Sequence, residues 1–243
     1  MDLRGQNAIV TGGAVRLGLA IAHKLAFEGA NVCVHCHSHA GDVQGVLSEI
    51  RGHGVAACAV AASFTEPVAA AQTVFERATE ELGPISILVN NAAIFEAATL
   101  AETTEDRWRR HLTVNLQAPA FLCREFSERL PEGRTGSIVN IVDWRALRPP
   151  TGHLPYTVSK AGLVALTKIL AQELAPRIQV NAVAPGAILP PAGSGKGALE
   201  ELAKRNPLKR TGRVSDVANA VAYLLKSEFM TGEVLHVTGG EEL

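Results

Sequence analysis

The sequence predicts an α/β fold in which a single parallel sheet is doubly wound, with helices on both of its faces. Short apolar runs alternate with longer helical patterns along all 243 residues. The runs are apolar at successive positions, which is typical of strands that are covered on both sides. Repeated strand–helix–strand order predicts parallel strands joined by right-handed crossovers. The predicted strands are Ala8–Thr11, Asn31–Cys36, Val55–Val60, Ile85–Asn90, Ser137–Val142, Ile178–Ala184 and Val234–Val237.

The helical patterns between these strands are long enough to cover the sheet, and no linker divides the chain. A hydrophobic fraction of 47% over this length suits one domain with a well-buried core. We therefore expect residues 1–243 to form a single domain. The clearest helical stretches are Gly18–Glu28, Val68–Leu82, Glu105–Leu130, Tyr156–Leu174 and Ser215–Lys226.

The segment Ile188–Lys209 breaks the alternation of strands and helices. Its first half contains Pro190, Pro191 and several glycines, which are followed by the short helical run Ala198–Lys204. The segment follows the end of a predicted strand, which is where open α/β sheets bind their ligands. We predict a substrate lid at 188–209, and the alternative is a plain surface insertion.

Charge and composition exclude several classes of protein. The formal net charge is -1 and Lys and Arg are scattered, so we expect neither nucleic acid nor a membrane as a partner. No apolar stretch approaches the roughly 18 residues of a membrane span. The polar start Met1–Gln6 predicts no secretory leader. Four cysteines are too few for a disulfide scaffold, which favours a cytoplasmic location.

A glycine-rich turn follows the first predicted strand. Thr11-Gly12-Gly13 leaves the strand, and Gly18 opens the next helix. Glycines let the backbone approach a pyrophosphate closely, and a helix N-terminus favours the negative charge of the phosphates. Because this turn lies between the first strand and the first helix, it predicts a Rossmann-type site for a nicotinamide dinucleotide.

The residues after the second strand bear on which dinucleotide is bound. An NAD site usually has Asp or Glu there to hold the ribose 2′-hydroxyl. Here His37, Ser38 and His39 follow the strand, and the first carboxylate is Asp42. Arg16 lies in the glycine turn, where its guanidinium can meet a 2′-phosphate. The sequence therefore favours NADP(H) over NAD(H).

Two cysteines on the second strand, Cys33 and Cys36, offer an alternative use of this region as a zinc or redox site, together with the nearby histidines. Side chains alternate along a strand, so the two cysteines should point to opposite faces. No second cluster of Cys and His in the sequence supplies further ligands. We therefore expect no metal, and we interpret Cys33 as a small buried hydrophobe.

Tyr156 and Lys160 stand four residues apart at the start of a predicted helix and share one of its faces. An ammonium beside a phenol favours the phenolate, so Lys160 should lower the pKa of Tyr156 and ease proton exchange near neutral pH. Two further features make the pair specific in combination with the glycine turn. They are Asn90-Asn91-Ala92-Ala93 after the fourth strand and Pro185-Gly186 after the sixth.

With these features the chain resembles the short-chain dehydrogenase/reductase family over almost its whole length. The resemblance implies seven strands in the order 3-2-1-4-5-6-7 and a homotetramer that acts on a small molecule. It implies that Tyr156 donates a proton, that Lys160 binds ribose and that Asn115 is the family's helix asparagine. Ser63 stands where the family usually has an Asp that holds the adenine amino group. The predicted cofactor contacts are Thr11, Gly12, Arg16, Leu17, Gly18, His37, Ser38, Ser63, Asn91, Ala92, Tyr156, Lys160, Pro185 and Gly186.

Three departures from the common family pattern coincide. Asp143 stands thirteen residues before Tyr156, where the family usually has a serine hydroxyl for a carbonyl substrate. An ionised carboxylate only accepts hydrogen bonds and would repel a developing oxyanion, but it suits a substrate with N–H donors. Arg16 replaces a glycine of the turn, and Phe95 follows the fourth strand. At all three positions the chain resembles the pteridine reductase subgroup, in which the aromatic residue stacks on the pterin.

These residues together predict one substrate site, in which a flat ring lies against Phe95 and presents its N–H groups to Asp143. Arg16 would lie near an edge oxygen of the ring or near the cofactor phosphate. The predicted catalytic residues are Asp143, Tyr156, Lys160 and Asn115, and the predicted substrate contacts are Arg16, Phe95, Asp143 and Tyr156.

Each of the three departures also has a plainer interpretation. Phe95 can be a buried loop aromatic, Asp143 a turn cap or a lost serine, and Arg16 a solvated residue at a helix start. The subgroup's arginine after the second strand is absent here, so a 2′-phosphate would rely on Arg16, Ser38 and the two neighbouring histidines.

Three functions follow from these interpretations. The first is an NADPH-dependent reductase of a pterin or dihydropterin. The second is a carbonyl reductase acting on a 3-oxoacyl or similar ketone. The third is a protein that binds a dinucleotide without turnover, although Tyr156, Lys160 and Asn115 are all present.

Overall fold

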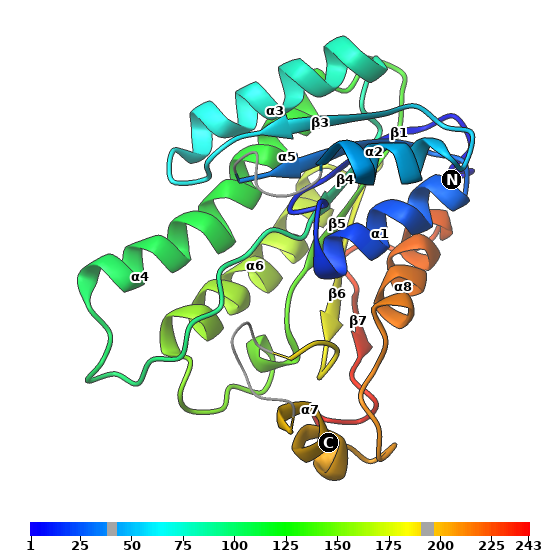
Figure 1. Cartoon of the computed structure of the whole chain (residues 1–243). Helices are drawn as coiled ribbons and strands as arrows, with labels where there is room; N and C mark the ends of the chain where they lie inside the picture. Colours follow the sequence, from blue (N-terminus) through cyan, green and yellow to red (C-terminus); the bar gives the residue numbers. More distant parts are fainter. Residues whose placement is uncertain (38–42, 191–196) are drawn as a thin grey trace.

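A computed structural model describes residues 1–37, 43–190 and 197–243, with a seven-stranded sheet at its centre (Figure 1). The strand order is β3-β2-β1-β4-β5-β6-β7, and every pair of neighbouring strands is parallel. The predicted fold class and strand order are therefore confirmed. The strands are β1 Asn7–Val10, β2 Asn31–Cys36, β3 Ala57–Ala61, β4 Ile87–Asn90, β5 Gly136–Ile141, β6 Ile178–Pro185 and β7 Val234–Val237.

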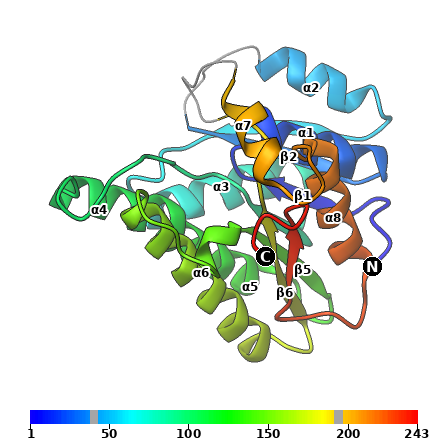
Figure 2. The same ribbon diagram turned by 90° about the horizontal axis from the view of Figure 1, so that it is seen from below.

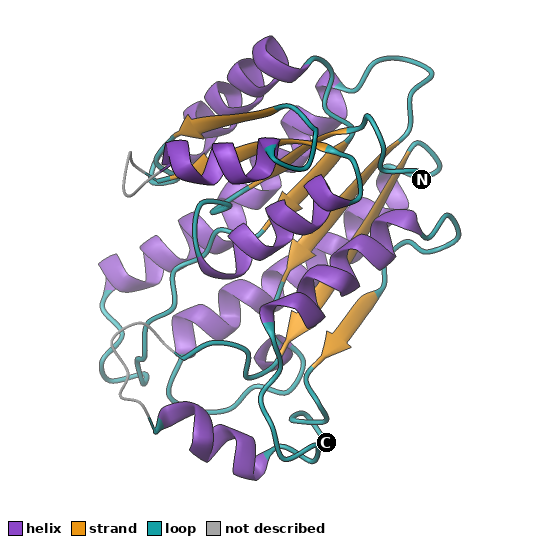
Figure 3. Cartoon of the chain, turned by 45° about the vertical axis from the view of Figure 1, so that its right-hand side comes forward, coloured by secondary structure: helices purple, strands orange, loops and turns teal. Residues whose placement is uncertain are grey.

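Helices cover both faces of this sheet, as Figures 2 and 3 show. Helices α1, α2 and α8 lie on one face, and α3, α5 and α6 lie on the other. The α-helices are α1 Arg16–Phe27, α2 Val43–Arg51, α3 Pro67–Leu82, α4 Glu105–Leu112, α5 Ala118–Arg129, α6 Leu154–Glu173, α7 Ala198–Arg205 and α8 Val214–Lys226. No helix in the described part of the chain is both long and apolar enough to span a bilayer.

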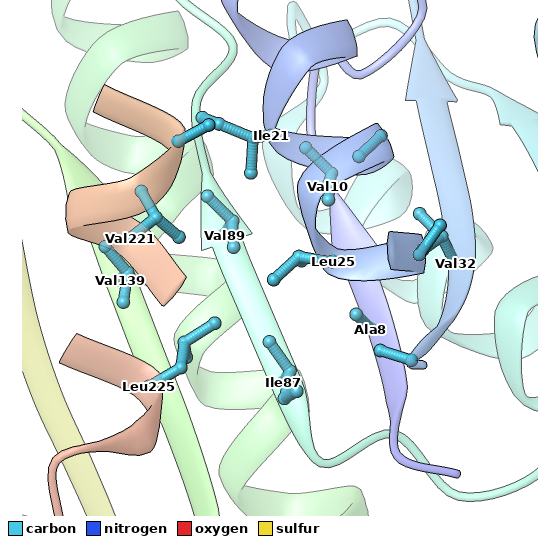
Figure 4. Close-up of a cluster of buried hydrophobic side chains, with 14 of the residues drawn as sticks. Ala8, Val10, Ile21, Leu25, Val32, Ile87, Val89, Val139, Val221 and Leu225 are labelled. Carbon is cyan, nitrogen blue, oxygen red and sulfur yellow. The ribbon is translucent and has the colours of Figure 1, made fainter. Parts of the chain in front are cut away.

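The hydrophobic core follows from the two-residue period of the strands. Ala8 and Val10 of β1 pack with α1 and α8, whereas Ile9 between them packs with α3 and α5 on the opposite face. Figure 4 shows the first of these two layers, in which Val89 and Val221 belong to one buried cluster. Burial of both faces explains why the strands are apolar at successive positions.

The long helical stretch predicted at Glu105–Leu130 is helical throughout but is not a single α-helix. A π-helical segment, Thr113–Gln117, joins α4 to α5, and the Ala118 N–H bonds to the Thr113 carbonyl five residues back. Pro119 has no N–H to donate, so the Asn115 carbonyl loses its usual α-helical partner. Such π-segments are frequent at functional sites, and this one carries Asn115.

Two helices differ in how far the sequence predicted them. Helix α2 was not singled out by its sequence pattern, although it buries Leu47 and Ile50. The short helical run at 198–204 corresponds to α7, which lies beyond the carboxyl ends of β6 and β7 (Figure 1). Within the predicted segment 188–209, residues 191–196 fall outside the described part of the chain.

Cys33 and Cys36 are both buried, and all four cysteines are free thiols. Cys33 of β2 pairs in register with Cys58 of β3 and belongs to the apolar cluster under α3. Among residues 1–37, 43–190 and 197–243, no group of three or more His, Cys, Asp or Glu side chains is arranged to hold a metal ion.

Candidate active site

The glycine turn between β1 and α1 is fastened to the end of β4. The Thr11 hydroxyl accepts the N–H groups of Asn91 and Ala92 at 2.9 and 3.0 Å. The Asn91 amide donates to the Thr11 carbonyl at 2.9 Å. Gly12 and Arg16 both adopt left-handed backbone, with φ of 61° and 53°. For Arg16 this conformation is uncommon, and strained non-glycine residues cluster at ligand sites.

Gly18 has no room for a side chain. A Cβ at this position would meet the Gly12 carbonyl oxygen and would lie 2.6 Å from the Asn91 amide nitrogen. The first-turn N–H groups of α1 have no acceptor within the helix and are therefore available to an anion. The glycines let the backbone of the turn approach that anion closely. The turn is therefore shaped as a phosphate cradle.

We predict that Gly18→Ala weakens dinucleotide binding. The added methyl must push the turn away from Asn91, and overpacking of this kind costs about 1–3 kcal/mol, or roughly tenfold or more in affinity. Titration of the variant with NADP⁺ measures the dissociation constant, and thermal unfolding without ligand reports the folded state. Unchanged affinity in a folded Gly18→Ala variant would contradict this description of the turn.

A cleft of about 970 Å³ opens above the carboxyl ends of β1, β2 and β4. It brings together most of the predicted cofactor residues. Thr11 supports the cleft from below without lining it, and Ser38 lies outside the described residues. The predicted residues that line the cleft are Gly12, Arg16, Leu17, Gly18, His37, Ser63, Asn91 and Ala92.

Arg16 lines the cleft and also reaches the predicted lid. Its guanidinium Nη2 donates to the Pro190 carbonyl at 2.6 Å. Pro185 and Gly186, which were predicted to contact the cofactor, lie at the end of β6 beside β7, where the Gly186 N–H bonds to the Val237 carbonyl. Glu241 was not predicted here; its carboxylate accepts the Ala187 N–H at 2.6 Å.

Tyr156 and Lys160 lie on one face of α6, and both are buried. The Tyr156 hydroxyl donates to Asp143 Oδ2 at 2.8 Å, and Lys160 Nζ donates to the Ile141 carbonyl at 2.7 Å. Burial lowers the pKa of Lys160 to about 8, against an opposing effect of Asp143. The structure thus assembles three of the predicted catalytic residues at the end of β5.

The pKa of Tyr156 is not lowered, in contrast to what was expected from the neighbouring Lys160. Burial and the neighbouring Asp143 carboxylate raise the pKa of Tyr156 well above its ordinary value. The prediction of a lowered pKa was wrong because it considered the ammonium on the same helix, and neither the burial of the phenol nor its hydrogen bond to Asp143. The phenol therefore stays protonated at neutral pH and is suited to donate a proton.

Asp143 uses its two oxygens differently. Oδ1 accepts the Arg145 N–H at 2.8 Å and so caps the short 3-10 helix Trp144–Ala146, whereas Oδ2 accepts the Tyr156 hydroxyl. The Arg145 guanidinium lies 3.3 Å from Oδ1. The turn-cap interpretation of Asp143 is thus correct for one oxygen, and the other oxygen faces the catalytic tyrosine.

Phe95 is not a buried loop aromatic, because 40% of it is exposed. Its ring stacks on His153 with centroids 4.6 Å apart and meets the Tyr156 ring edge-on at 4.7 Å. Arg145 lies 5.8 Å from the Phe95 centroid. His153 was missed because its position three residues before Tyr156 carries no pattern. The Phe95 loop is held there by a bridge between Ala98 and His153.

Asn115 links this aromatic cluster to the cleft. Its amide oxygen accepts the Ile94 N–H at 2.9 Å, and its amide nitrogen donates to the Ile94 carbonyl and to the Ser159 hydroxyl. Ile94 lines the cleft, and Phe95 follows it. The π-helical segment therefore positions the loop that joins the dinucleotide cleft to Tyr156.

Known proteins share this architecture. A family model described as enoyl-(acyl carrier protein) reductase matches residues 13–242. A short-chain type dehydrogenase/reductase of Picea abies is 38% identical over 98% of this chain and 93% of its own length. A 3-oxoacyl-(acyl-carrier-protein) reductase FabG of Staphylococcus epidermidis is 32% identical over 97% of this chain and 98% of its own.

A crystal structure of FolM alternative dihydrofolate reductase 1 from Brucella canis, complexed with NADP, matches with a TM-score of 0.94. It is 33% identical, and the match covers 99% of this chain and 95% of that one.

Enzymes that move hydride to and from nicotinamide are built on such a sheet, and the cleft with the neighbouring Tyr156–Lys160 pair makes this protein an NAD(P)H-dependent oxidoreductase. The agreement over nearly the whole chain narrows this class. The chain belongs to the short-chain dehydrogenase/reductase family.

Proposed function

We propose that this enzyme is an NADPH-dependent reductase of a pterin or dihydropterin. The observation that carries the proposal is the hydrogen bond from the Tyr156 hydroxyl to Asp143 Oδ2 at 2.8 Å. A carboxylate at this position accepts N–H groups and disfavours an oxyanion, so the pair suits a nitrogen heterocycle better than a ketone. The similarity to a protein named dihydrofolate reductase adds support.

The residues present fit a dinucleotide. The left-handed turn, which approaches α1 so closely that a Cβ at Gly18 has no space, forms a cradle for phosphates. The cleft of about 970 Å³ has room for the rest of the dinucleotide. NADPH, when bound, supplies the hydride. Gly12, Gly18 and the first turn of α1 would hold its phosphates, and Lys160 its ribose.

The chain's own residues would then act on the substrate ring. Tyr156 remains protonated because its pKa is raised, so it can give its proton to a ring nitrogen. Asp143 would accept the substrate's N–H groups and hold the phenol in place. The exposed Phe95 ring offers an apolar surface for a flat heterocycle. Lys160 is buried and cationic below its pKa of about 8, so its charge would stabilise the phenolate that Tyr156 becomes after it gives up the proton.

A preference for NADP(H) over NAD(H) is also part of the proposal. Arg16 and His37 line the cleft, and neighbouring structures contain NADP. The bond from Arg16 to Pro190 also supports a role of residues 188–209 as a lid, because it connects the phosphate turn to the start of that segment. The single-domain organisation, the homotetramer and the cytoplasmic location stay predictions.

The test is a comparison of substrates and cofactors. We expect purified protein to oxidise NADPH, followed by its absorbance, with dihydrobiopterin or dihydrofolate faster than with a 3-oxoacyl ketone, and to use NADH poorly. Turnover of the ketone with no turnover of any pterin would overturn the proposal.

The second candidate is a ketone reductase, favoured by the relationship to FabG of Staphylococcus epidermidis. Turnover of the 3-oxoacyl ketone without turnover of any pterin would establish this second candidate. NADPH binding without turnover of either substrate would instead favour a binding protein.

A further inference from the structure

A buried histidine lies between the phosphate turn and the loop after β3, and no step above uses it. His35 is on β2, which lies between β1 and β3 in the sheet (Figure 1). It follows Val34, the last residue of β2 that pairs with β1, so it lies alongside the start of the glycine turn. Only 2% of the residue is exposed, and it lines the cleft.

Both nitrogens of the His35 ring are used, and their partners define its tautomer. The Gly12 N–H donates to Nδ1 at 3.2 Å, so Nδ1 must be an unprotonated acceptor. Nε2 lies 3.0 Å from the Ala62 carbonyl, so Nε2 must carry the proton. Phe64 stacks on the ring with centroids 4.2 Å apart. The neutral imidazole is therefore a fixed bridge from Gly12 to Ala62.

The environment keeps this imidazole neutral. Burial lowers the pKa of His35 to about 4, because the charged form would lose its hydration. A protonated Nδ1 could no longer accept the Gly12 N–H. The main chain of His35 adds a further tie, since its carbonyl accepts the Gly13 N–H at 3.0 Å.

The bridge joins the two parts of the cleft that would hold the phosphates and the adenine of a dinucleotide. Gly12 begins the phosphate turn, and Ala62 directly precedes Ser63, the predicted adenine contact. We infer that His35 is a positioning residue for the cofactor. It holds the phosphate turn and the loop after β3, which carries Ser63, at a fixed separation. It thereby sets dinucleotide affinity without touching the reacting atoms. The inference rests on the dinucleotide cofactor but on neither candidate substrate.

Three substitutions separate the two bonds. His35→Asn can place an amide oxygen near Nδ1 and keep the Gly12 bond, whereas His35→Gln can place an amide N–H near Nε2 and keep the Ala62 bond. His35→Leu keeps neither. Because a preorganised site avoids the cost of ordering on binding, we expect the Kd for NADP⁺ to rise about tenfold with Asn or Gln and about 10²-fold with Leu.

The control is His111→Asn on α4, since His111 is also fully buried and does not line the cleft. We expect it to lower the melting temperature while leaving the Kd for NADP⁺ within about twofold of the wild type. At saturating NADPH, kcat of the Asn and Gln variants should also stay within about twofold, so that the loss is confined to cofactor affinity.

Calorimetry with NADP⁺ alone measures these constants without any substrate, so a failure of the pterin proposal leaves this test intact. A Kd within twofold of the wild type in folded His35→Asn and His35→Gln would overturn the inference. A loss of kcat with unchanged affinity would overturn it as well, and absence of dinucleotide binding by the wild type would overturn the cofactor assignment itself.

Discussion

Replacement of Tyr156 by phenylalanine is expected to lower kcat for the preferred substrate by about 10³-fold, within the range usual for loss of a general acid. The ring and its edge-on contact with Phe95 are kept, so only the hydroxyl is removed. Cofactor affinity should change little, because the hydroxyl bonds to Asp143 and not to the phosphate turn. Steady-state rates together with a Kd for NADP⁺ measure both effects.

The chain supplies a matched control in its other tyrosine, Tyr223, which is 55% exposed on α8. Tyr223→Phe makes the same chemical change far from the cleft and should retain full activity. Removal of the Tyr156 hydroxyl leaves Asp143 Oδ2 without its 2.8 Å donor, so a modest fall in melting temperature should accompany the Tyr156 change. Activity within tenfold of the wild type would show that another group donates the proton.

The pH dependence of the wild type follows from the same groups. Tyr156 stays protonated well above neutrality because its pKa is raised, whereas Lys160 loses its charge as the pH rises through about 8. Reductase kcat/KM should therefore be level below pH 8 and fall above it. Lys160→Arg keeps the charge and should move the fall to higher pH. An increase in activity above pH 8 would indicate that the phenolate is the active form.

The fold could be predicted from the sequence because its periodicities are local. Short apolar runs such as Asn31–Cys36 are typical of strands buried on both faces, and this run coincides with β2 in the structure. Helix α2 was not predicted because its apolar pattern is short. The π-helical segment at Thr113–Gln117 escaped because the distortion depends on Pro119 and on a tertiary bond between Asn115 and Ile94.

The candidate site could be predicted only in part, because many of its contacts are tertiary. Sequence spacing places Tyr156 and Lys160 on one helical face and Asp143 in the same site, but it does not show how deeply Tyr156 is buried. Burial, together with the Asp143 carboxylate, reverses the expected shift of the Tyr156 pKa. A polar residue inside an apolar strand was the one available signal for His35, and its interpretation needed the positions of Gly12 and Ala62. Contacts between loops far apart in sequence have no period that a pattern can reveal.

Asp143→Ser is expected to exchange one substrate class for the other. The hydroxyl can donate to a carbonyl oxygen, which a carboxylate cannot, and it removes the negative charge that would oppose an oxyanion. We expect kcat/KM for a dihydropterin to fall by about 10²-fold and that for a 3-oxoacyl ketone to stay level or rise. Parallel assays of both substrates with NADPH measure the exchange as a ratio of the two constants.

Asp143→Asn separates charge from shape in the same assays. The amide keeps the size of the side chain and can still accept the Arg145 N–H, so the cap of the 3-10 helix should survive. Its activity with a pterin should nevertheless fall, because a neutral amide holds N–H groups less strongly than a carboxylate does. Asp2→Ser, a change in an exposed carboxylate at the start of the chain, should affect neither substrate.

The two variants together decide between the candidate functions. Were the enzyme a ketone reductase with an unusual carboxylate, Asp143→Ser would raise ketone turnover, and no pterin activity would exist to be lost. For a pterin reductase both substitutions must lower the rate with the heterocycle, because each removes the negative charge that holds its N–H groups. The ratio matters more than either rate, since a change in folding or in cofactor affinity affects both substrates alike and cancels.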